Sequence, residues 1–272
     1  MEVAIITGAS SGIGKGLAEL LASKNIKVYG ISRSKIQSEK NINISADITN
    51  EKVIENVIKD IYDKEKRIDY LINNAGMGIS GSIEATNLED LKQIIDVNFV
   101  GLFIMTKYVL KYMRKQKKGR IINIGSVASE FSIPFQSFYS STKAAVKSFS
   151  QSLQNEVSCY GINVTTILPG DVATSFTKNR KKNQNELNVY KNRVNKSIDL
   201  MAKDEQNGMS ISYVSNQIYK IMKKKKMPIQ KTIGFKYKIF MFIKRFLPNN
   251  FVNYIVGKIY AFKKEGYNAE EF

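Results

Sequence analysis

Short β-branched runs alternate with longer amphipathic stretches along this chain, and this alternation restricts its possible folds more than any other feature. Helical spacing of apolar residues occurs in a stretch that ends at Ala22 and in Glu51–Lys64, Leu88–Met113 and Tyr139–Tyr160. Strands that alternate with helices form crossover units, whose sheet is parallel and covered on both faces. We therefore predict a doubly wound α/β fold, a three-layer sandwich around a mostly parallel seven-stranded sheet. Its expected strands are Glu2–Ile6, Lys27–Ile31, Ile42–Ala46, Asp69–Asn73, Arg120–Gly125, Ile162–Leu168 and, less regular than these, Pro228–Phe235.

The length and the cysteine and histidine content exclude several classes of protein. With 272 residues, the chain can form one large domain with a sizeable core. Its single cysteine, Cys159, cannot form an internal disulfide, and one cysteine without any histidine cannot build a common zinc site. We therefore expect no metal and exclude zinc dehydrogenases and metallohydrolases. The N-terminus enters an apolar run without a basic segment or cleavage site, so we expect a cytoplasmic protein.

A glycine-rich loop follows the first predicted strand. Residues Thr7–Gly14 read TGASSGIG, with glycines at positions 8, 12 and 14. At a strand-to-helix junction, such a loop lets a dinucleotide pyrophosphate rest on the N-terminus of the helix. The spacing differs from the GxGxxG pattern, and glycine loops also serve as plain turns. The position at the first junction nevertheless favours dinucleotide binding.

Three polar residues in the middle of the chain form a pattern typical of proton transfer. Tyr139 and Lys143 are four residues apart, about one turn from each other on the same face of a helix. An ammonium beside a phenol favours the phenolate, so we expect Lys143 to lower the pKa of Tyr139 from its usual value of about 10. Ser126 precedes this pair and offers a hydroxyl. Because the chain has no histidine, these groups are its candidates for acid–base chemistry.

These motifs, together with others in the same order, make the chain similar to the short-chain dehydrogenase/reductase family. The resemblance covers about residues 1–177 and 208–235 and extends over most of the family's known motifs. The matching segments are TGASSGIG at Thr7–Gly14, NNAG at Asn73–Gly76, Asn98 in the long helix, Ser126, the YxxxK of Tyr139 and Lys143, and PGDVAT at Pro169–Thr174.

The resemblance implies a Rossmann-like oxidoreductase that interconverts a ketone or aldehyde and an alcohol with a nicotinamide cofactor. Tyr139 would exchange a proton with the substrate oxygen, and the Ser126 hydroxyl would hydrogen-bond that oxygen. Lys143 would hold the nicotinamide ribose, and Asn98 would anchor a water that links Lys143 to solvent. Beside Tyr139 and Lys143, the residues implied to bind the cofactor are Gly8, Ser10, Ser11, Gly12, Ile13, Gly14, Ser32, Arg33, Asp47, Ile48, Asn74, Ala75, Gly76, Pro169, Gly170, Val172 and Thr174.

The end of the second predicted strand favours NADP(H) over NAD(H). Members of the family that use NAD usually carry an acidic residue there, which accepts hydrogen bonds from the ribose diol. This chain has Ser32 and Arg33 instead. A guanidinium offers a planar, charged fork to a 2′-phosphate, although Arg33 could also be a plain loop residue.

The basic charge of the chain is concentrated in its last third. Residues 1–177 hold 21 Lys and Arg against 17 Asp and Glu, a net charge of +4, whereas residues 178–272 hold 21 against 7, a net charge of +14. Ile239–Leu247 and Phe251–Phe262 are apolar runs too short to span a bilayer, which takes about 20 residues. Lysines and arginines, including Lys263 and Lys264, surround them, so we predict interfacial amphipathic helices. The alternative is packing on a partner subunit.

We therefore divide the chain into a Rossmann-type domain at 1–235 and a basic helical extension at 236–272. Residues 175–207 are polar and occupy the place of the family's substrate lid, and Phe131, Phe135 and Phe138 precede Tyr139 as candidate pocket residues. The expected substrate is a small or lipid carbonyl compound, and the expected assembly is a homodimer or homotetramer. Nucleic-acid binding lacks a reading motif. A membrane-surface reductase of a long-chain lipid or steroid ketone and a non-catalytic NADP-binding sensor or scaffold are the alternative functions.

Overall fold

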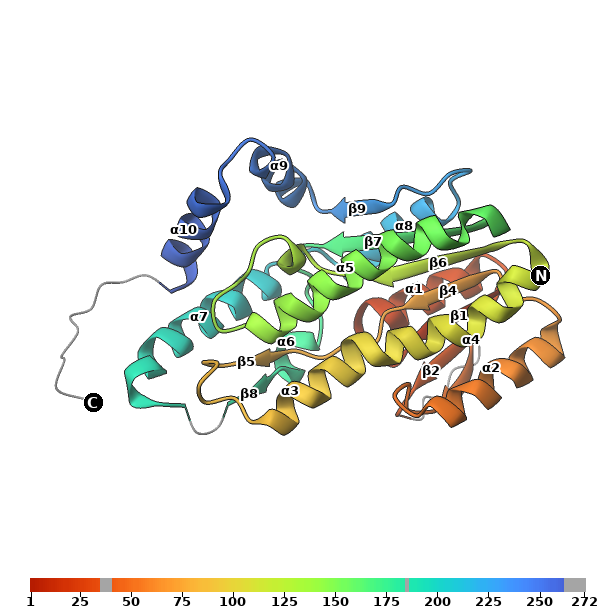
Figure 1. Ribbon diagram of the computed structural model, residues 1–272, viewed down its shortest axis with the longest axis horizontal. Coiled ribbons are helices and arrows are strands. Elements are labelled where there is room, and N and C mark those ends of the chain that lie inside the picture. The colour runs from red at the N-terminus through yellow and green to blue at the C-terminus, as the bar shows by residue number, and fades with distance from the viewer. Residues whose placement is uncertain (35–40, 184–185, 262–272) are drawn as a thin grey trace.

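Seven strands form the central sheet, in the order β3-β2-β1-β4-β6-β7-β9 (Figure 1). The computed structural model describes residues 1–34, 41–183 and 186–261. All pairings in the sheet are parallel, and the connections run outward in both directions from β1 and β4, so the predicted doubly wound fold is confirmed. The strands are β1 (Glu2–Thr7), β2 (Ile26–Ser32), β3 (Ile42–Ser45), β4 (Tyr70–Asn73), β6 (Gly119–Ile124), β7 (Ile162–Pro169) and β9 (Gln230–Ile233).

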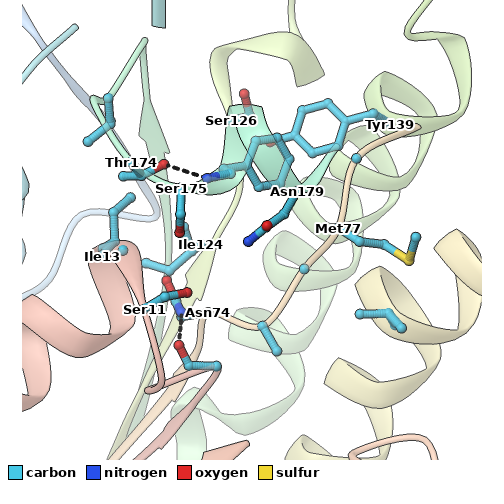
Figure 2. Close-up of a pocket in the computed structure, with 18 of the residues that line it drawn as sticks. Ser11, Ile13, Asn74, Met77, Ile124, Ser126, Tyr139, Thr174, Ser175 and Asn179 are labelled. Carbon is cyan, nitrogen blue, oxygen red and sulfur yellow. Dashed lines mark hydrogen bonds between the residues drawn. The ribbon is translucent and has the colours of Figure 1, made fainter. Parts of the chain in front are cut away.

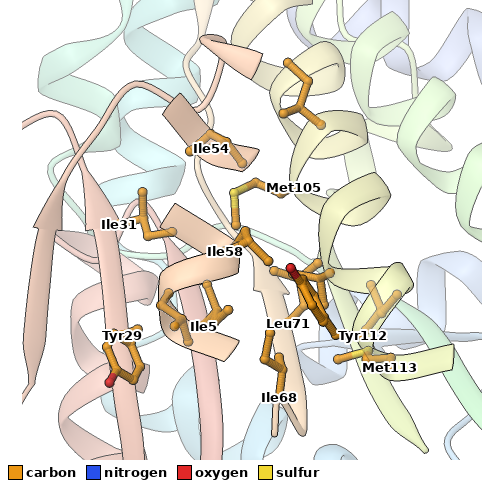
Figure 3. Packing of buried hydrophobic residues seen from close by; sticks show 14 of the residues in the cluster. Ile5, Tyr29, Ile31, Ile54, Ile58, Ile68, Leu71, Met105, Tyr112 and Met113 are labelled. Carbon is orange, nitrogen blue, oxygen red and sulfur yellow. The ribbon is translucent and has the colours of Figure 1, made fainter. Parts of the chain in front are cut away.

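Helices cover both faces of the sheet because side chains alternate along each strand. Alternate residues of β1 therefore join two separate hydrophobic clusters. One face carries α2 (Glu51–Glu65), α4 (Gly101–Gln116) and α5 (Ser137–Val157), and the other carries α1 (Gly12–Ser23) and α8 (Ile211–Met222). Figure 3 shows the first cluster, where Ile54 and Ile58 of α2 face Met105 of α4. Burial of each aliphatic side chain stabilises the folded state by about 1.5–3 kcal/mol. The two clusters therefore hold the strands, and with them the loops at the strand ends, in fixed positions.

A π-helical turn interrupts the helix expected over Leu88–Met113. α3 (Leu88–Ile95) leads into the π-turn Asp96–Val100, and α4 completes the helix. Leu88–Gln116 is long and apolar enough to span a membrane, but α4 buries Met105 and Val109 against the sheet, as a core helix does. Such π-turns are frequent at functional sites, and this one contains Asn98.

The polar segment after β7 folds into more regular structure than its composition indicates. It forms α6 (Phe176–Asn179), β8 (Lys181–Lys182) and α7 (Asn188–Gln206), and β8 pairs with β5 (Ile79–Ser80) in a small second sheet. Val194, Ile198 and Met201 of α7 are buried against Ile133 and Phe135. Three apolar residues at helical spacing are thus enough to dock this otherwise hydrophilic helix.

Both apolar runs of the C-terminal extension are helical, as α9 (Phe235–Lys244) and α10 (Asn249–Tyr260). Figure 1 places α9 beyond β9 at one edge of the molecule and α10 beside α7. Lys244 Nζ donates a hydrogen bond to Glu130 at 2.9 Å, and the Tyr237 hydroxyl donates one to Asp171. Phe262, Lys263 and Lys264, which the sequence analysis assigned to this amphipathic region, lie outside the described residues, and the division at residue 235 stays a prediction.

Candidate active site

The NNAG segment at the end of β4 holds the glycine-rich loop in place. The Thr7 hydroxyl accepts hydrogen bonds from the backbone N–H groups of Asn74 and Ala75, both at 3.0 Å. The Asn74 side chain donates in return to the carbonyls of Thr7 at 3.0 Å and Gly8 at 3.2 Å. Gly8 has a φ of +66°, and a Cβ at Gly14 would lie 2.3 Å from the Gly8 carbonyl oxygen, so both positions require glycine.

A cleft of about 510 Å³ opens above the carboxyl ends of the central strands. It lies where the strand order reverses, which is the usual ligand position in an open parallel sheet. All the predicted site residues except Gly14 and Asn98 line this cleft. Figure 2 shows how Ser11 and Asn74 at one end and Ser126 and Tyr139 at the other face the same space. The fold therefore brings together the glycine loop, NNAG, Ser126, the YxxxK pair and PGDVAT with the residues that follow the second and third strands.

Ser126, Tyr139 and Lys143 lie at the catalytic end of the cleft. Ser126 follows β6, and its hydroxyl oxygen accepts a hydrogen bond from the backbone N–H of Ala128 at 3.1 Å. Tyr139 and Lys143 occupy the first two turns of α5. Lys143 Nζ donates to the Ile124 carbonyl at 2.8 Å and lies 5.7 Å from the centre of the Tyr139 ring. Ser126 thus lies at the same end of the cleft as Tyr139 and Lys143, which are one helical turn apart, as the sequence pattern predicts.

Burial controls the proton affinities of these groups. It raises the pKa of Tyr139 to about 12, against the opposing effect of a hydrogen bond with Ser126. Burial also lowers the pKa of Lys143 to about 8. The expectation of a Tyr139 pKa below its usual value is therefore wrong for this structure, because burial outweighs the effects that favour the phenolate. The phenol stays protonated near neutral pH, which is the form that can donate a proton.

Asn98 holds the loop that follows the NNAG motif. Its side chain is buried, and its Oδ1 accepts a hydrogen bond from the Met77 N–H at 2.8 Å. Its Nδ2 donates to the Met77 carbonyl at 3.0 Å and to the Thr142 hydroxyl at 3.1 Å. These contacts position backbone beside the cleft and tie α5 to the π-turn. The expected water relay through Asn98 stays a prediction.

The opposite end of the cleft carries the residues expected to select the cofactor. The Ser32 hydroxyl donates to the Ser34 carbonyl at 2.9 Å, and the exposed Arg33 lines the rim. Asp47 accepts hydrogen bonds from the N–H of Thr49 at 2.9 Å and from its hydroxyl at 2.8 Å. The Asp47 carboxylate is thus engaged in a local turn, and among the described residues Arg33 is the cation that lines the cleft beside the end of β2.

Sequence reasoning missed the cleft residues that the lid segment contributes. Phe176, Asn179 and Glu205 line the cleft, and the Phe176 ring lies 5.5 Å from the Tyr139 ring. No motif marks these residues, and their only signal is a position after PGDVAT. Among the candidate pocket aromatics, Phe135 lines a second pocket of about 590 Å³ beside α7 and α10 instead of the cleft.

The chain belongs to the short-chain dehydrogenase family. The family described as short chain dehydrogenase matches residues 2–185, which carry the cleft's glycine loop, NNAG, serine and YxxxK motifs. The protein is therefore a reductase or dehydrogenase that acts on carbonyl or CH–OH groups, and NAD(P)(H) is the cofactor typical of this family.

Two relatives and two solved structures illustrate this similarity. The 3-ketodihydrosphingosine reductase of Bacteroides thetaiotaomicron is 36% identical over 268 residues, which cover 96% of this chain and 99% of that protein. The 3-oxoacyl-[acyl-carrier-protein] reductase of Synechocystis is 39% identical over 190 residues, 65% of this chain and 77% of that protein. A short-chain dehydrogenase from Streptomyces avermitilis superimposes with a TM-score of 0.81 at 25% identity, covering 94% of this chain and 95% of that one. ElxO with NADP bound gives a TM-score of 0.74 at 25% identity, covering 88% and 99%.

The cleft fits a nicotinamide dinucleotide. The glycine loop and the N-terminus of α1 offer backbone N–H groups to a pyrophosphate. Gly76 lies at the catalytic end, where an added Cβ would crowd Asn98 Oδ1 at 3.3 Å. The Lys143 ammonium has three donors and makes one hydrogen bond among those described above, to Ile124, so it can still donate to ribose hydroxyls.

Proposed function

We propose that this protein reduces the 3-keto group of a long-chain sphingoid ketone, 3-ketodihydrosphingosine, with NADPH as the hydride donor. The observation that carries this proposal is the extent of similarity to the Bacteroides reductase, which spans nearly the whole chain and so includes most of the extension. Similarity to the carrier-protein reductase covers only about two thirds of the chain. The lid and tail determine which substrate reaches the cleft, so their shared presence favours a shared substrate.

In this proposal the bound nicotinamide supplies a hydride to the carbonyl carbon. Tyr139 donates its phenolic proton to the carbonyl oxygen, and the Ser126 hydroxyl stabilises the charge that develops there. Lys143 holds the ribose and, while protonated, stabilises the phenolate that Tyr139 becomes. Asn98 keeps Met77 and α5 in place around these groups. The balanced reaction converts ketone, NADPH and a proton into alcohol and NADP⁺.

NADPH is the cofactor that the adenosine end of the cleft favours. Arg33 supplies a permanent positive charge at the rim, and Ser32 adds a hydroxyl beside it. A 2′-phosphate would form charge-assisted hydrogen bonds with this pair. The NADP bound in ElxO, a structural relative, is consistent with this choice.

The extension would hold the protein on the surface that stores its substrate, the cytoplasmic face of an anionic membrane. Large apolar side chains of α9, α10 and the turn between them are exposed, most strongly Phe235 and Phe242 of α9 at 77% and 60% and Phe246 of the turn at 73%. The exposed cations of this region are Lys236 and Lys238 of α9, Arg245 just after α9, and Lys258 of α10. Apolar side chains with a cationic fringe match the two components of an anionic bilayer surface.

Reduction of a 3-oxoacyl thioester is the second candidate, favoured by the Synechocystis relative. Both candidates need the same catalytic groups and differ in what flanks the ketone. A non-catalytic sensor is disfavoured because Ser126, Tyr139 and Lys143 all remain in place at the cleft.

A substrate comparison tests the proposal. The full chain is assayed for NADPH oxidation with 3-ketodihydrosphingosine, with a 3-oxoacyl thioester of equal chain length, and with short ketones. We expect the highest kcat/KM for the sphingoid ketone, and a kcat lowered by about 10²–10⁴-fold in Tyr139→Phe. A higher kcat/KM for the thioester would assign the second function, and activity confined to short ketones would reject both.

A further inference from the structure

The lid segment places a buried ion pair against the catalytic end of the cleft. The side chain of Arg180, between α6 and β8, is 1% exposed, and its guanidinium pairs with Glu205 near the end of α7. Glu205 also accepts a hydrogen bond from the Thr177 hydroxyl. Its carboxylate is 16% exposed and lines the same cleft as Tyr139. A charged side chain is thus presented to the substrate, with its partner behind it.

Arg180 is committed to holding this carboxylate. In the amide orientation that satisfies both groups, the Gln136 side-chain oxygen accepts hydrogen bonds from Arg180 at 3.2 and 3.3 Å. The guanidinium also lies over the Phe176 ring, 5.8 Å from its centre. These contacts surround the arginine with protein groups. A carboxylate can accept about four hydrogen bonds, so Glu205 keeps acceptor capacity beyond Arg180 and Thr177.

The charges around Tyr139 are unfavourable for a neutral ketone. Glu205 and Asp171 both raise the pKa of the Tyr139 phenol, and Arg180 lowers it with a smaller effect than Glu205. A field that opposes a phenolate also opposes the negative charge that develops on a carbonyl oxygen during reduction. A positive charge carried by the substrate itself, next to the carbonyl, would offset this field.

We propose that Glu205 is a specificity-determining residue that binds a primary ammonium on the carbon next to the reacting carbonyl. This inference rests on the proposed function, since a 3-ketosphingoid base carries an amine at that carbon and a 3-oxoacyl thioester carries none. Arg180 positions Glu205 through their ion pair. Arg180 and Thr177 contact Glu205, and Tyr139 and Asp171 line the same cleft. Asp171 and Tyr260 also interact with Glu205 electrostatically.

The test compares matched substrates that differ at one group. Kinetics are measured with 3-ketodihydrosphingosine and with two neutral analogues of equal chain length, one with a hydroxyl and one with an acetamido group in place of the amine. We expect the parent protein to prefer the ammonium substrate by about tenfold or more in kcat/KM, because the ammonium forms a charge-assisted hydrogen bond with Glu205. In Glu205→Gln this ratio should fall towards one.

A second variant keeps the test valid if an unpaired Arg180 destabilises the fold. The double variant Arg180→Met, Glu205→Gln removes both charges, and its ratio should also fall towards one, whereas Arg180→Lys should keep the preference. Partial unfolding lowers the rate with every substrate and leaves the ratio unchanged. A parent that reduces all three long-chain ketones equally would overturn the role of Glu205 while the proposed function stands. Retention of the preference by Glu205→Gln or by the double variant would overturn it as well. A parent inactive on all three would reject the proposed function itself.

Discussion

Lys143 has to carry a positive charge inside the protein, and its surroundings make this unfavourable. The side chain is 5% exposed, and its described hydrogen bond is to a neutral carbonyl. Burial lowers its pKa from 10.5 to about 8. A shift of this size corresponds to about 3 kcal/mol of lost stability when the group is charged at neutral pH. The charged Lys143 therefore lowers the stability of the fold, and its role is in the reaction.

Replacing this ammonium by an apolar group of similar length should stabilise the fold. We expect Lys143→Met to raise the free energy of unfolding by about 2 kcal/mol at pH 7 and to abolish activity. The advantage should shrink from pH 8 to pH 10, because the folded parent then releases a proton that its unfolded chain still binds, so the parent gains stability. Urea unfolding at several pH values measures both curves. A variant less stable than the parent at pH 7 would contradict this account.

Tyr139 is the expected proton donor, and its removal has a separable effect. Tyr139→Phe should lower kcat for ketone reduction by about 10²–10⁴-fold, because the phenolic proton is lost while the ring keeps its contact with Phe176. NADPH affinity, measured by fluorescence titration, should change little. A phenylalanine variant as active as the parent would show that another group donates the proton.

Arg33 should distinguish the two nicotinamide cofactors. We expect Arg33→Ala to weaken NADPH binding by about tenfold or more, because the variant loses a charge-assisted contact with the 2′-phosphate. NADH lacks this phosphate, so its binding should remain nearly unchanged. Lys24→Ala, an exposed cation outside the cleft, is the matched control. Equal affinities of the parent for NADPH and NADH would contradict the cofactor preference.

The sequence could identify the cleft residues that belong to motifs, because their chemistry constrains both residue type and spacing. It could not identify Arg180 and Glu205. They are 25 positions apart, and only the fold of α6, β8 and α7 brings them together. It also misjudged the Tyr139 pKa, since spacing on a helix places two groups near each other without saying how much water surrounds them.

At the scale of elements, α9 and α10 expose an apolar face that soluble domains normally cover. The ring of Phe242 in α9 packs edge-to-face with the ring of Phe246 in the following turn, 5.3 Å between ring centres. We expect the full chain to sediment with anionic vesicles, less so as salt increases, and Phe242→Glu to weaken this binding strongly. Neutral vesicles are the lipid control. A full chain that ignores anionic vesicles would reject membrane attachment.

The lid shows why element prediction fails locally. Its composition is polar, yet α7 docks through a few apolar positions, and Lys181 pairs with Asp90 of α3 to hold β8. Contacts of this kind join segments far apart in the sequence and leave no periodic signal. The five inner strands β1, β2, β4, β6 and β7, in contrast, were predictable nearly to their ends, because they are almost wholly buried. The edge strands β3 and β9 are partly exposed and carry polar residues, so their sequence signal is weaker.

At the scale of the whole molecule, a second apolar surface lies on α3 and α4, where Leu88, Ile95 and Phe103 are exposed. We predict that this surface and α5 form a two-fold subunit contact, in a dimer or tetramer. Phe103→Glu should dissociate the assembly in sedimentation velocity without loss of vesicle binding. Phe242→Glu should do the reverse. If Phe242→Glu dissociates the assembly instead, the tail is the subunit contact.

The π-turn that contains Asn98 changes the direction in which side chains point on the two halves of one helix. The buried positions Asp90, Ile94, Asn98 and Leu102 follow each other at intervals of four residues. An α-helix turns about 100° per residue, so three such intervals overshoot by about 120°, roughly one residue. The wider π-turn absorbs this surplus. Asp90 at one end of the helix can thus face Lys181 of the lid, while Met105 in its other half faces the core of the sheet. Deleting a single residue from the π-turn would rotate one half of the helix relative to the other, so both contacts could no longer form.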